Sequence, residues 1–119
     1  MNGRRILVVD DNQDAALTLA LVLELEGHDV RVSHSGEEAV LQASTFRPDI
    51  IFMDIALPNI DGWQAAREIR SRPWGRDITI LALSGYSAPE DRQRSAEAGM
   101  DGHLVKPIDP LDLVRIIPH

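Results

Sequence analysis

Three short apolar runs in this chain carry no polar alternation, at residues 6–9, 50–53 and 78–83. A strand with one face in water alternates apolar and polar side chains, whereas a strand covered on both faces of a parallel sheet reads as a continuous apolar run. We therefore expect these runs to form the central strands of a parallel sheet that has helices on both sides.

Two more strands are predicted from weaker patterns. Residues 103–105 form a short apolar run, and residues 29–33 alternate Val30 and Val32 with polar neighbours, which is typical of an edge strand. Helical character lies between the strands, at residues 14–26, 36–46, 61–72 and 89–98 and again from residue 109. The first helical segment has Leu17, Leu21 and Leu25 on one stripe.

Residues that begin or end helices occur at the predicted boundaries. They are the capping boxes Ser35 with Glu38 and Ser87 with Glu90, the helix-ending glycines Gly27 and Gly99, and the Asp109-Pro110 pair at the last helix start. Strand and helix thus alternate five times, and parallel strands joined by helical crossovers make a three-layer α/β sandwich.

Length and composition limit the classes of protein to consider. A chain of 119 residues with 44% apolar and 26% charged residues matches one globular domain, and it contains no cysteine for disulfides or thiolate chemistry. The net charge of −7 argues against nucleic-acid binding by this chain alone. Since the longest apolar run falls short of a membrane span, we expect a cytoplasmic protein that does not bind membranes.

Polar residues stand where the predicted strands end. These are Asp10, Asp11, Asp54, Ser84 and Lys106. In an open parallel sheet the ligand site lies beyond the carboxyl ends of the strands, so we expect these five residues to converge on one rim. A lone aspartate after a strand is usually a helix cap or a turn residue, but the five together form a pattern that such roles do not predict.

The chemistry of this rim points to a divalent cation and a phosphoryl group. Clustered carboxylates repel one another unless a cation neutralises them, and an all-oxygen set suits Mg²⁺. The lysine and the hydroxyl supply donors for phosphoryl oxygens, and an aspartate can act as the nucleophile and form an acyl phosphate.

Two other classes of protein are considered. A small phosphatase-like hydrolase with an aspartate phosphoenzyme would need a second acid near the nucleophile, yet Asp54-Ile55-Ala56 lacks one, and the chain is too short for a substrate cap. A flavodoxin-like cofactor binder would need a Ser/Thr-rich phosphate loop after the first strand, and the chain has Asp10-Asp11-Asn12 there.

The segments ILVVDD, FMDIALPNIDG, LALSGY and LVKP together resemble the receiver domain of two-component response regulators. The resemblance covers about residues 5–117. It implies a flavodoxin-like doubly wound sheet of five parallel strands in the order 2-1-3-4-5. It also implies that residues 1–119 are a single receiver domain.

The resemblance implies roles for the rim residues. Asp54 would be the phosphoacceptor and a ligand of Mg²⁺, Asp11 a direct ligand, Asp10 a ligand through water, and Ala56 a ligand through its backbone carbonyl. Lys106 would pair with the phosphoryl group and Ser84 would hydrogen-bond to it, while the Lys106-Pro107 peptide bond would be cis.

The implied function is a phosphoacceptor signalling domain that takes its phosphoryl group from a phosphohistidine on a sensor histidine kinase or a histidine phosphotransfer protein. It would catalyse only its own phosphorylation and dephosphorylation, and it would signal to a downstream protein through the fourth helix, fifth strand and fifth helix. His103 stands where the family usually has an aromatic residue. We interpret His28, His34 and His119 as surface residues without metal-ligand spacing.

Overall fold

The computed structural model describes residues 3–85 and 89–117. Strands and helices alternate along the chain, with one short 3-10 helix, η1, before the fourth strand. The elements are β1 Arg5–Val9, α1 Gln13–Leu25, β2 Asp29–Ser33, α2 Gly36–Phe46, β3 Ile50–Asp54, α3 Gly62–Arg70, η1 Pro73–Gly75, β4 Thr79–Ser84, α4 Pro89–Glu97, β5 Gly102–Val105 and α5 Pro110–Ile116.

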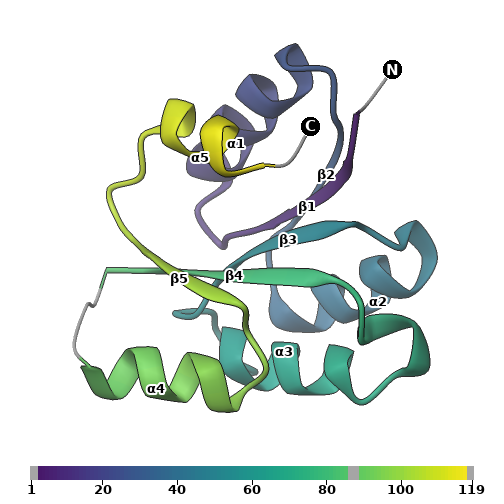
Figure 1. The fold of residues 1–119 in the computed structure, drawn as a ribbon, viewed down its shortest axis with the longest axis vertical. Helices are drawn as coiled ribbons and strands as arrows, with labels where there is room; N and C mark the ends of the chain where they lie inside the picture. Colours follow the sequence, from purple (N-terminus) through teal and green to yellow (C-terminus); the bar gives the residue numbers. More distant parts are fainter. Residues whose placement is uncertain (1–2, 86–88, 118–119) are drawn as a thin grey trace.

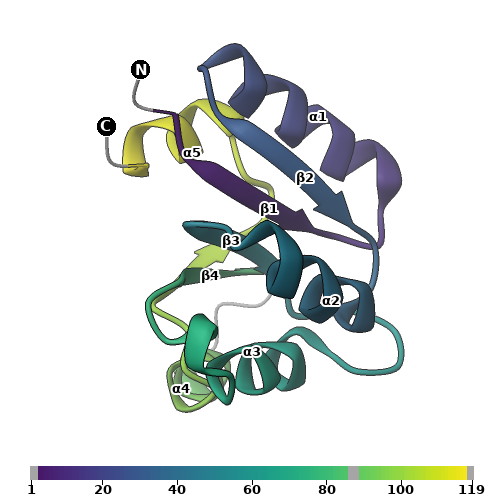
Figure 2. The ribbon, with the colours of Figure 1, turned by 90° about the vertical axis from the view of Figure 1, so that its right-hand side faces the viewer.

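The sheet has five parallel strands in the order β2-β1-β3-β4-β5, so the predicted order is confirmed. Helices α1 and α5 lie on one face, and α2, α3 and α4 lie on the other (Figure 1). A view from the side shows the sheet between these two layers (Figure 2). The three-layer sandwich expected from the sequence is therefore present, and β2 is an edge strand as its alternation predicted.

Each central strand sends alternate side chains to opposite faces of the sheet. In β1, Ile6 and Val8 pack toward α1 and α5, whereas Leu7 and Val9 pack toward α2 and α3. Because both faces are covered, the whole strand is apolar, which explains the continuous run in the sequence. Strand β3 is buried along its full length, including its last residue, Asp54.

The leucine stripe of α1 exists but lies on the solvent side of the helix. Leu17, Leu21 and Leu25 are 55%, 61% and 85% exposed, while Ala16 and Leu23 pack against the sheet. The helix is apolar on nearly every side, so a leucine spacing cannot by itself identify the buried face. Small alanines are the residues that let α1 approach the sheet closely.

The helix starts and ends follow the predicted signals. The side chain of Ser35 accepts a hydrogen bond from the Glu38 amide, and Asp109 caps α5 in the same manner. Gly27 and Gly99 have φ of 94° and 89°, the left-handed conformation that glycine adopts without strain. Ser87, expected to cap the fourth helix, lies outside the described residues. Within residues 3–85 and 89–117, no helix has the length and apolar character needed to cross a membrane.

Candidate functional site

The carboxyl ends of four strands bring the five predicted rim residues to the same edge of the sheet. Asp10 follows β1, Asp54 and Ser84 end β3 and β4, and Lys106 follows β5. The strand register places Asp54 beside Leu83 and Ser84 beside Val105. The backbone amide of Lys106 donates to the carbonyl of Ser84 at 2.7 Å, which fixes where the lysine side chain begins.

Lys106 connects the acids at the centre of this rim. Its Nζ donates to Asp54 Oδ2 at 2.9 Å and to Asp10 Oδ2 at 3.3 Å. Asp10 and Asp54 are buried, with 5% and 3% of their surface exposed, and Asp11 is exposed. Carboxylate oxygens of Asp10, Asp11 and Asp54 all lie within 4.8 Å of one another. Lys106 is also the single lysine of the sequence, in which every other basic side chain apart from histidine is arginine.

Backbone donors hold the other oxygens of the two buried carboxylates. The Asn12 amide donates to Asp10 Oδ1 at 3.0 Å, and the Ala56 amide donates to Asp54 Oδ1 at 3.0 Å. Each carboxylate therefore has one oxygen anchored by the backbone and the other directed at Lys106. This arrangement leaves the two acids and Asp11 facing the same small volume.

Burial sets the electrostatics of the site. It raises the pKa of Asp54 above its usual 3.8, because the loss of water outweighs the hydrogen bonds from Lys106 and Ala56, and the nearby charge of Asp10 acts in the same direction. Burial also disfavours the charged form of Lys106, but its contacts with Asp54 and Asp10 outweigh that cost and raise the pKa of the ammonium. A carboxylate of this kind is stabilised by added positive charge.

The loop after Asp54 depends on Gly62, the first residue of α3. Gly62 donates from its amide to the Ile55 carbonyl at 3.1 Å. A β-carbon at Gly62 would overlap the carbonyl oxygen of Asp54 and would lie 2.7 Å from Ile55 Cα. Only glycine allows α3 to begin so close to the backbone of Asp54.

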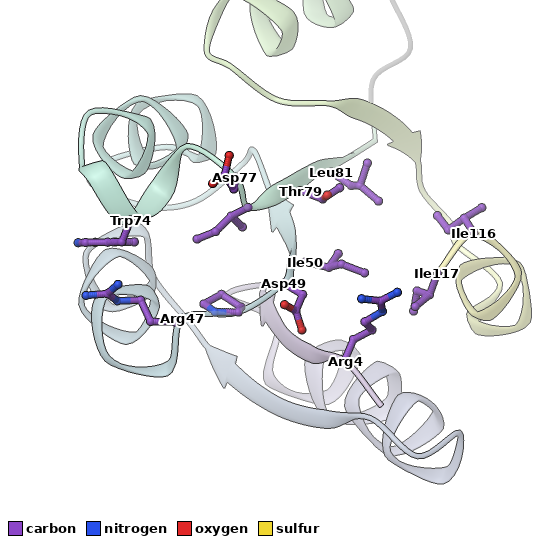
Figure 3. A pocket seen from close by; sticks show the side chains of 12 residues that line it. Arg4, Arg47, Asp49, Ile50, Trp74, Asp77, Thr79, Leu81, Ile116 and Ile117 are labelled. Carbon is purple, nitrogen blue, oxygen red and sulfur yellow. The ribbon is translucent and has the colours of Figure 1, made fainter. Parts of the chain in front are cut away.

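A groove of about 720 Å³ opens beside the acids, between α1 and the segment that joins β5 to α5. Asp10, Asn12 and Lys106 line its polar end. The Lys106-Pro107 peptide bond that borders it is cis, as expected. A second groove, of about 700 Å³, lies at the opposite ends of the strands, where Arg4, Asp49 and Ile117 surround it (Figure 3). Ligands of open parallel sheets bind at the carboxyl ends, so we assign the chemistry to the rim that holds the acids.

Two histidines make polar contacts that the sequence did not indicate. His28 is buried, and its Nδ1 accepts from the Arg4 amide at 2.9 Å. His34 is partly buried, and its Nδ1 lies 3.1 Å from the carbonyl oxygen of Asp10. The prediction that His28 is a surface residue is therefore wrong, whereas the partly exposed His34 is compatible with its prediction. His119 lies outside the described residues.

His103 is part of a polar contact that joins three elements. Its Nδ1 lies 3.1 Å from Ser95 Oγ, and the same oxygen accepts from Trp63 Nε1 at 2.9 Å. The buried Ser95 of α4 thereby contacts β5 through His103 and α3 through Trp63. The sequence offered no periodic signal for this contact, since it depends on how three different elements pack together.

The family model described as the response regulator receiver domain matches residues 6–118. The chain belongs to this family. Receiver domains are phosphoacceptor signalling modules of two-component systems, and the hydrolase alternative is not favoured.

This receiver domain is similar to parts of longer proteins. It is 38% identical over 114 residues to the transcriptional regulatory protein PrrA of Mycobacterium leprae, an alignment that covers 96% of this chain and 48% of PrrA. The chain thus spans about half the length of that regulator.

Two solved structures show the same fold. CheY4, a chemotaxis response regulator of Vibrio cholerae, has a TM-score of 0.91 at 28% identity, with 96% of this chain and 95% of CheY4 covered. The receiver domain of the sensor histidine kinase PA1611 from Pseudomonas aeruginosa PAO1 has a TM-score of 0.87 at 37% identity, with 97% and 94% covered. The latter structure has a magnesium ion coordinated in its active-site cleft.

Proposed function

We propose that this receiver domain takes a phosphoryl group onto Asp54. The observation that carries the proposal is the bridge of Lys106 Nζ between the buried carboxylates of Asp54 and Asp10, 2.9 and 3.3 Å away. Asp54 is thus a buried carboxylate with a raised pKa and one cation, Lys106, beside it. We expect such a carboxylate to accept a phosphoryl group that is accompanied by a second cation.

In the proposed reaction, a carboxylate oxygen of Asp54 attacks the phosphorus of the donor in line with the bond that breaks. A new oxygen–phosphorus bond forms, and the phosphorus–nitrogen bond of a phosphohistidine donor breaks, with its electron pair returning to the imidazole. Lys106 neutralises charge on the transferred oxygens, and the hydroxyl of Ser84 hydrogen-bonds to one of them.

The acids fit a hard divalent cation. Their donor set is all oxygen, and three carboxylates in such a small space are unfavourable without a cation. Asp10, Asp11, Asp54 and the backbone carbonyl of Ala56 would hold Mg²⁺, which when bound supplies neutralising charge for the phosphoryl oxygens. Lys106, which is paired with Asp54 and Asp10 in this structure, would supply a second positive charge for the phosphoryl oxygens.

We also propose a phosphoryl donor, a cellular location and a downstream partner for this domain. The donor is a sensor histidine kinase or a histidine phosphotransfer protein in the cytoplasm, and residues 1–119 act as one receiver domain. Catalysis is limited to the chain's own phosphorylation and dephosphorylation. The phosphorylated state is communicated to a protein partner through α4, β5 and α5, and this chain by itself does not bind nucleic acid.

The test uses acetyl phosphate and Mg²⁺ with the intact mass as the readout. The wild-type protein and Asp77→Asn, which changes an exposed acid far from the rim, should gain one phosphoryl adduct, whereas Asp54→Asn should gain none. An adduct of equal yield on Asp54→Asn would refute the assignment. Turnover of a small phosphate ester by the wild type would instead favour the hydrolase.

A further inference from the structure

The side chain of His34 reaches from the loop after β2 to the loop after β1. Its Nδ1 lies 3.1 Å from the backbone carbonyl oxygen of Asp10. A carbonyl oxygen can only accept a hydrogen bond, so Nδ1 must carry the proton and donate it. The sequence alone assigned no role to this histidine.

This contact completes the fixation of Asp10. The amide of Asp10 donates to the carbonyl of Ser33 at 3.1 Å. Both the amide and the carbonyl of Asp10 therefore contact residues at the end of β2. Its two carboxylate oxygens are held by the Asn12 amide and by Lys106 Nζ. Of these contacts, the His34 bond is the one made to the peptide group that Asp10 shares with Asp11.

Asp11 depends on that peptide group. The peptide unit is planar and rigid, so fixing the Asp10 carbonyl at one end also fixes the Asp11 nitrogen at the other. Asp11 is exposed, yet a carboxylate oxygen of it lies within 4.8 Å of oxygens of Asp10 and Asp54. The placement of the exposed acid therefore rests on its backbone, and His34 restrains the peptide unit before it.

We propose that His34 is a positioning residue for the cation site: it holds the Asp10–Asp11 peptide so that the Asp11 carboxylate faces Asp10 and Asp54. The inference rests on the proposed Mg²⁺ site and assigns to a residue of the edge-strand loop a share in cation affinity. Outer contacts that orient ligands change metal affinity by about 10- to 100-fold when lost, and one acting through a peptide unit should give about 3- to 10-fold.

Two variants separate the hydrogen bond from the bulk of the ring. In His34→Asn, the side-chain amide nitrogen occupies nearly the position of Nδ1 and can donate, whereas His34→Phe fills the space without a donor. Calorimetric titration with Mg²⁺, carried out in one buffer for all three proteins, should show Kd raised about 3- to 10-fold for His34→Phe. His34→Asn should stay within about twofold of the wild type.

Two further readouts distinguish positioning from a general loss of structure. At saturating Mg²⁺ the rate of phosphorylation by acetyl phosphate should be equal in His34→Phe and the wild type, because only the affinity has changed. In the metal-free protein, the amides of Asp11 and Asn12 should exchange with deuterium faster in His34→Phe than in His34→Asn. Equal Kd values for His34→Phe and the wild type, or a Kd for His34→Asn as high as that of His34→Phe, would overturn the inference.

The outcomes also separate this inference from the proposed function. A wild type that accepts a phosphoryl group while His34→Phe binds Mg²⁺ equally well refutes the role of His34 alone. A wild type that binds Mg²⁺ more tightly than His34→Phe but gains no phosphoryl adduct refutes the function and supports the role of His34.

Discussion

The guanidinium of Arg70, at the end of α3, joins three parts of the chain at the end of the sheet away from the acids. Its Nε donates to the Gly99 carbonyl at 2.8 Å, and its Nη1 donates to the carbonyls of Gly75 and Ile78 at 2.7 and 2.6 Å. Its Nη2 pairs with Asp101 at 2.8 Å. We predict that Arg70→Met, which keeps the aliphatic stem and removes every donor, strongly destabilises the fold.

The size of the effect follows from these contacts. The Arg70 side chain is 19% exposed, so most of its hydrogen bonds are shielded, and each bond to a carbonyl should contribute about 1 kcal/mol net. Asp101 is 50% exposed, so that pair adds at most about 1 kcal/mol. We expect a loss of about 3 kcal/mol in the free energy of unfolding, which lowers Tm by about 10 °C in a domain of this size.

Urea unfolding followed by circular dichroism measures this loss, with Arg67→Met as the matched control. Arg67 lies on the same helix and is exposed, so its replacement should change the free energy of unfolding by less than about 0.5 kcal/mol. If Arg70→Met lay within about 1 kcal/mol of the wild type, water would be replacing the arginine donors. The hydrogen bonds would then not be the reason that η1 and the α4–β5 turn stay together.

Three other predictions concern the site and the core. Burial raises the pKa of Asp54, so the native state releases this proton at a higher pH than the unfolded chain, and the charged carboxylate lowers the stability of the fold. Asp54→Asn should therefore be more stable than the wild type at neutral pH. Urea titrations should show this gain in stability shrinking as the pH falls toward 3.8. Gly62→Ala should lose more than about 2 kcal/mol of stability and its phosphoryl adduct, whereas Gly85→Ala, whose β-carbon would meet open space, should keep wild-type stability in the same melts. Leu23→Ala should cost about 2–4 kcal/mol and Leu25→Ala less than about 0.5 kcal/mol by thermal unfolding; equal losses would mean that the buried face of α1 is assigned wrongly.

Most of the sheet could be predicted from the sequence because burial on both faces leaves a direct mark on strand composition. The runs at 6–9 and 50–53 fall inside β1 and β3, and the predicted bounds of β2 and α2 agree with the structure. The buried face of α1 could not be predicted, since alanine and leucine both suit a helix interior and only tertiary contacts decide which packs against β1 and β3.

The rim residues were predictable because parallel strands deliver their final residues to the same edge. Asp10, Asp54 and Lys106 lie together as expected from strand ends alone. The contacts of His34 and His103 were not predictable. Each depends on how closely two elements or loops approach one another in the folded chain, and a single histidine carries no spacing pattern that would reveal it.

The single lysine of the sequence has a practical consequence. Among the side chains of residues 1–119, the Nζ of Lys106 is the one amine that acylating reagents can modify. A modified peptide that contains residue 106 therefore reports directly on the state of the acid pair. A compact ammonium can shift from two carboxylates to a third anionic group, whereas the forked guanidinium of arginine would bind one carboxylate in a fixed plane. The rate of acylation of Lys106 can therefore follow the occupancy of the site without a label introduced by mutation.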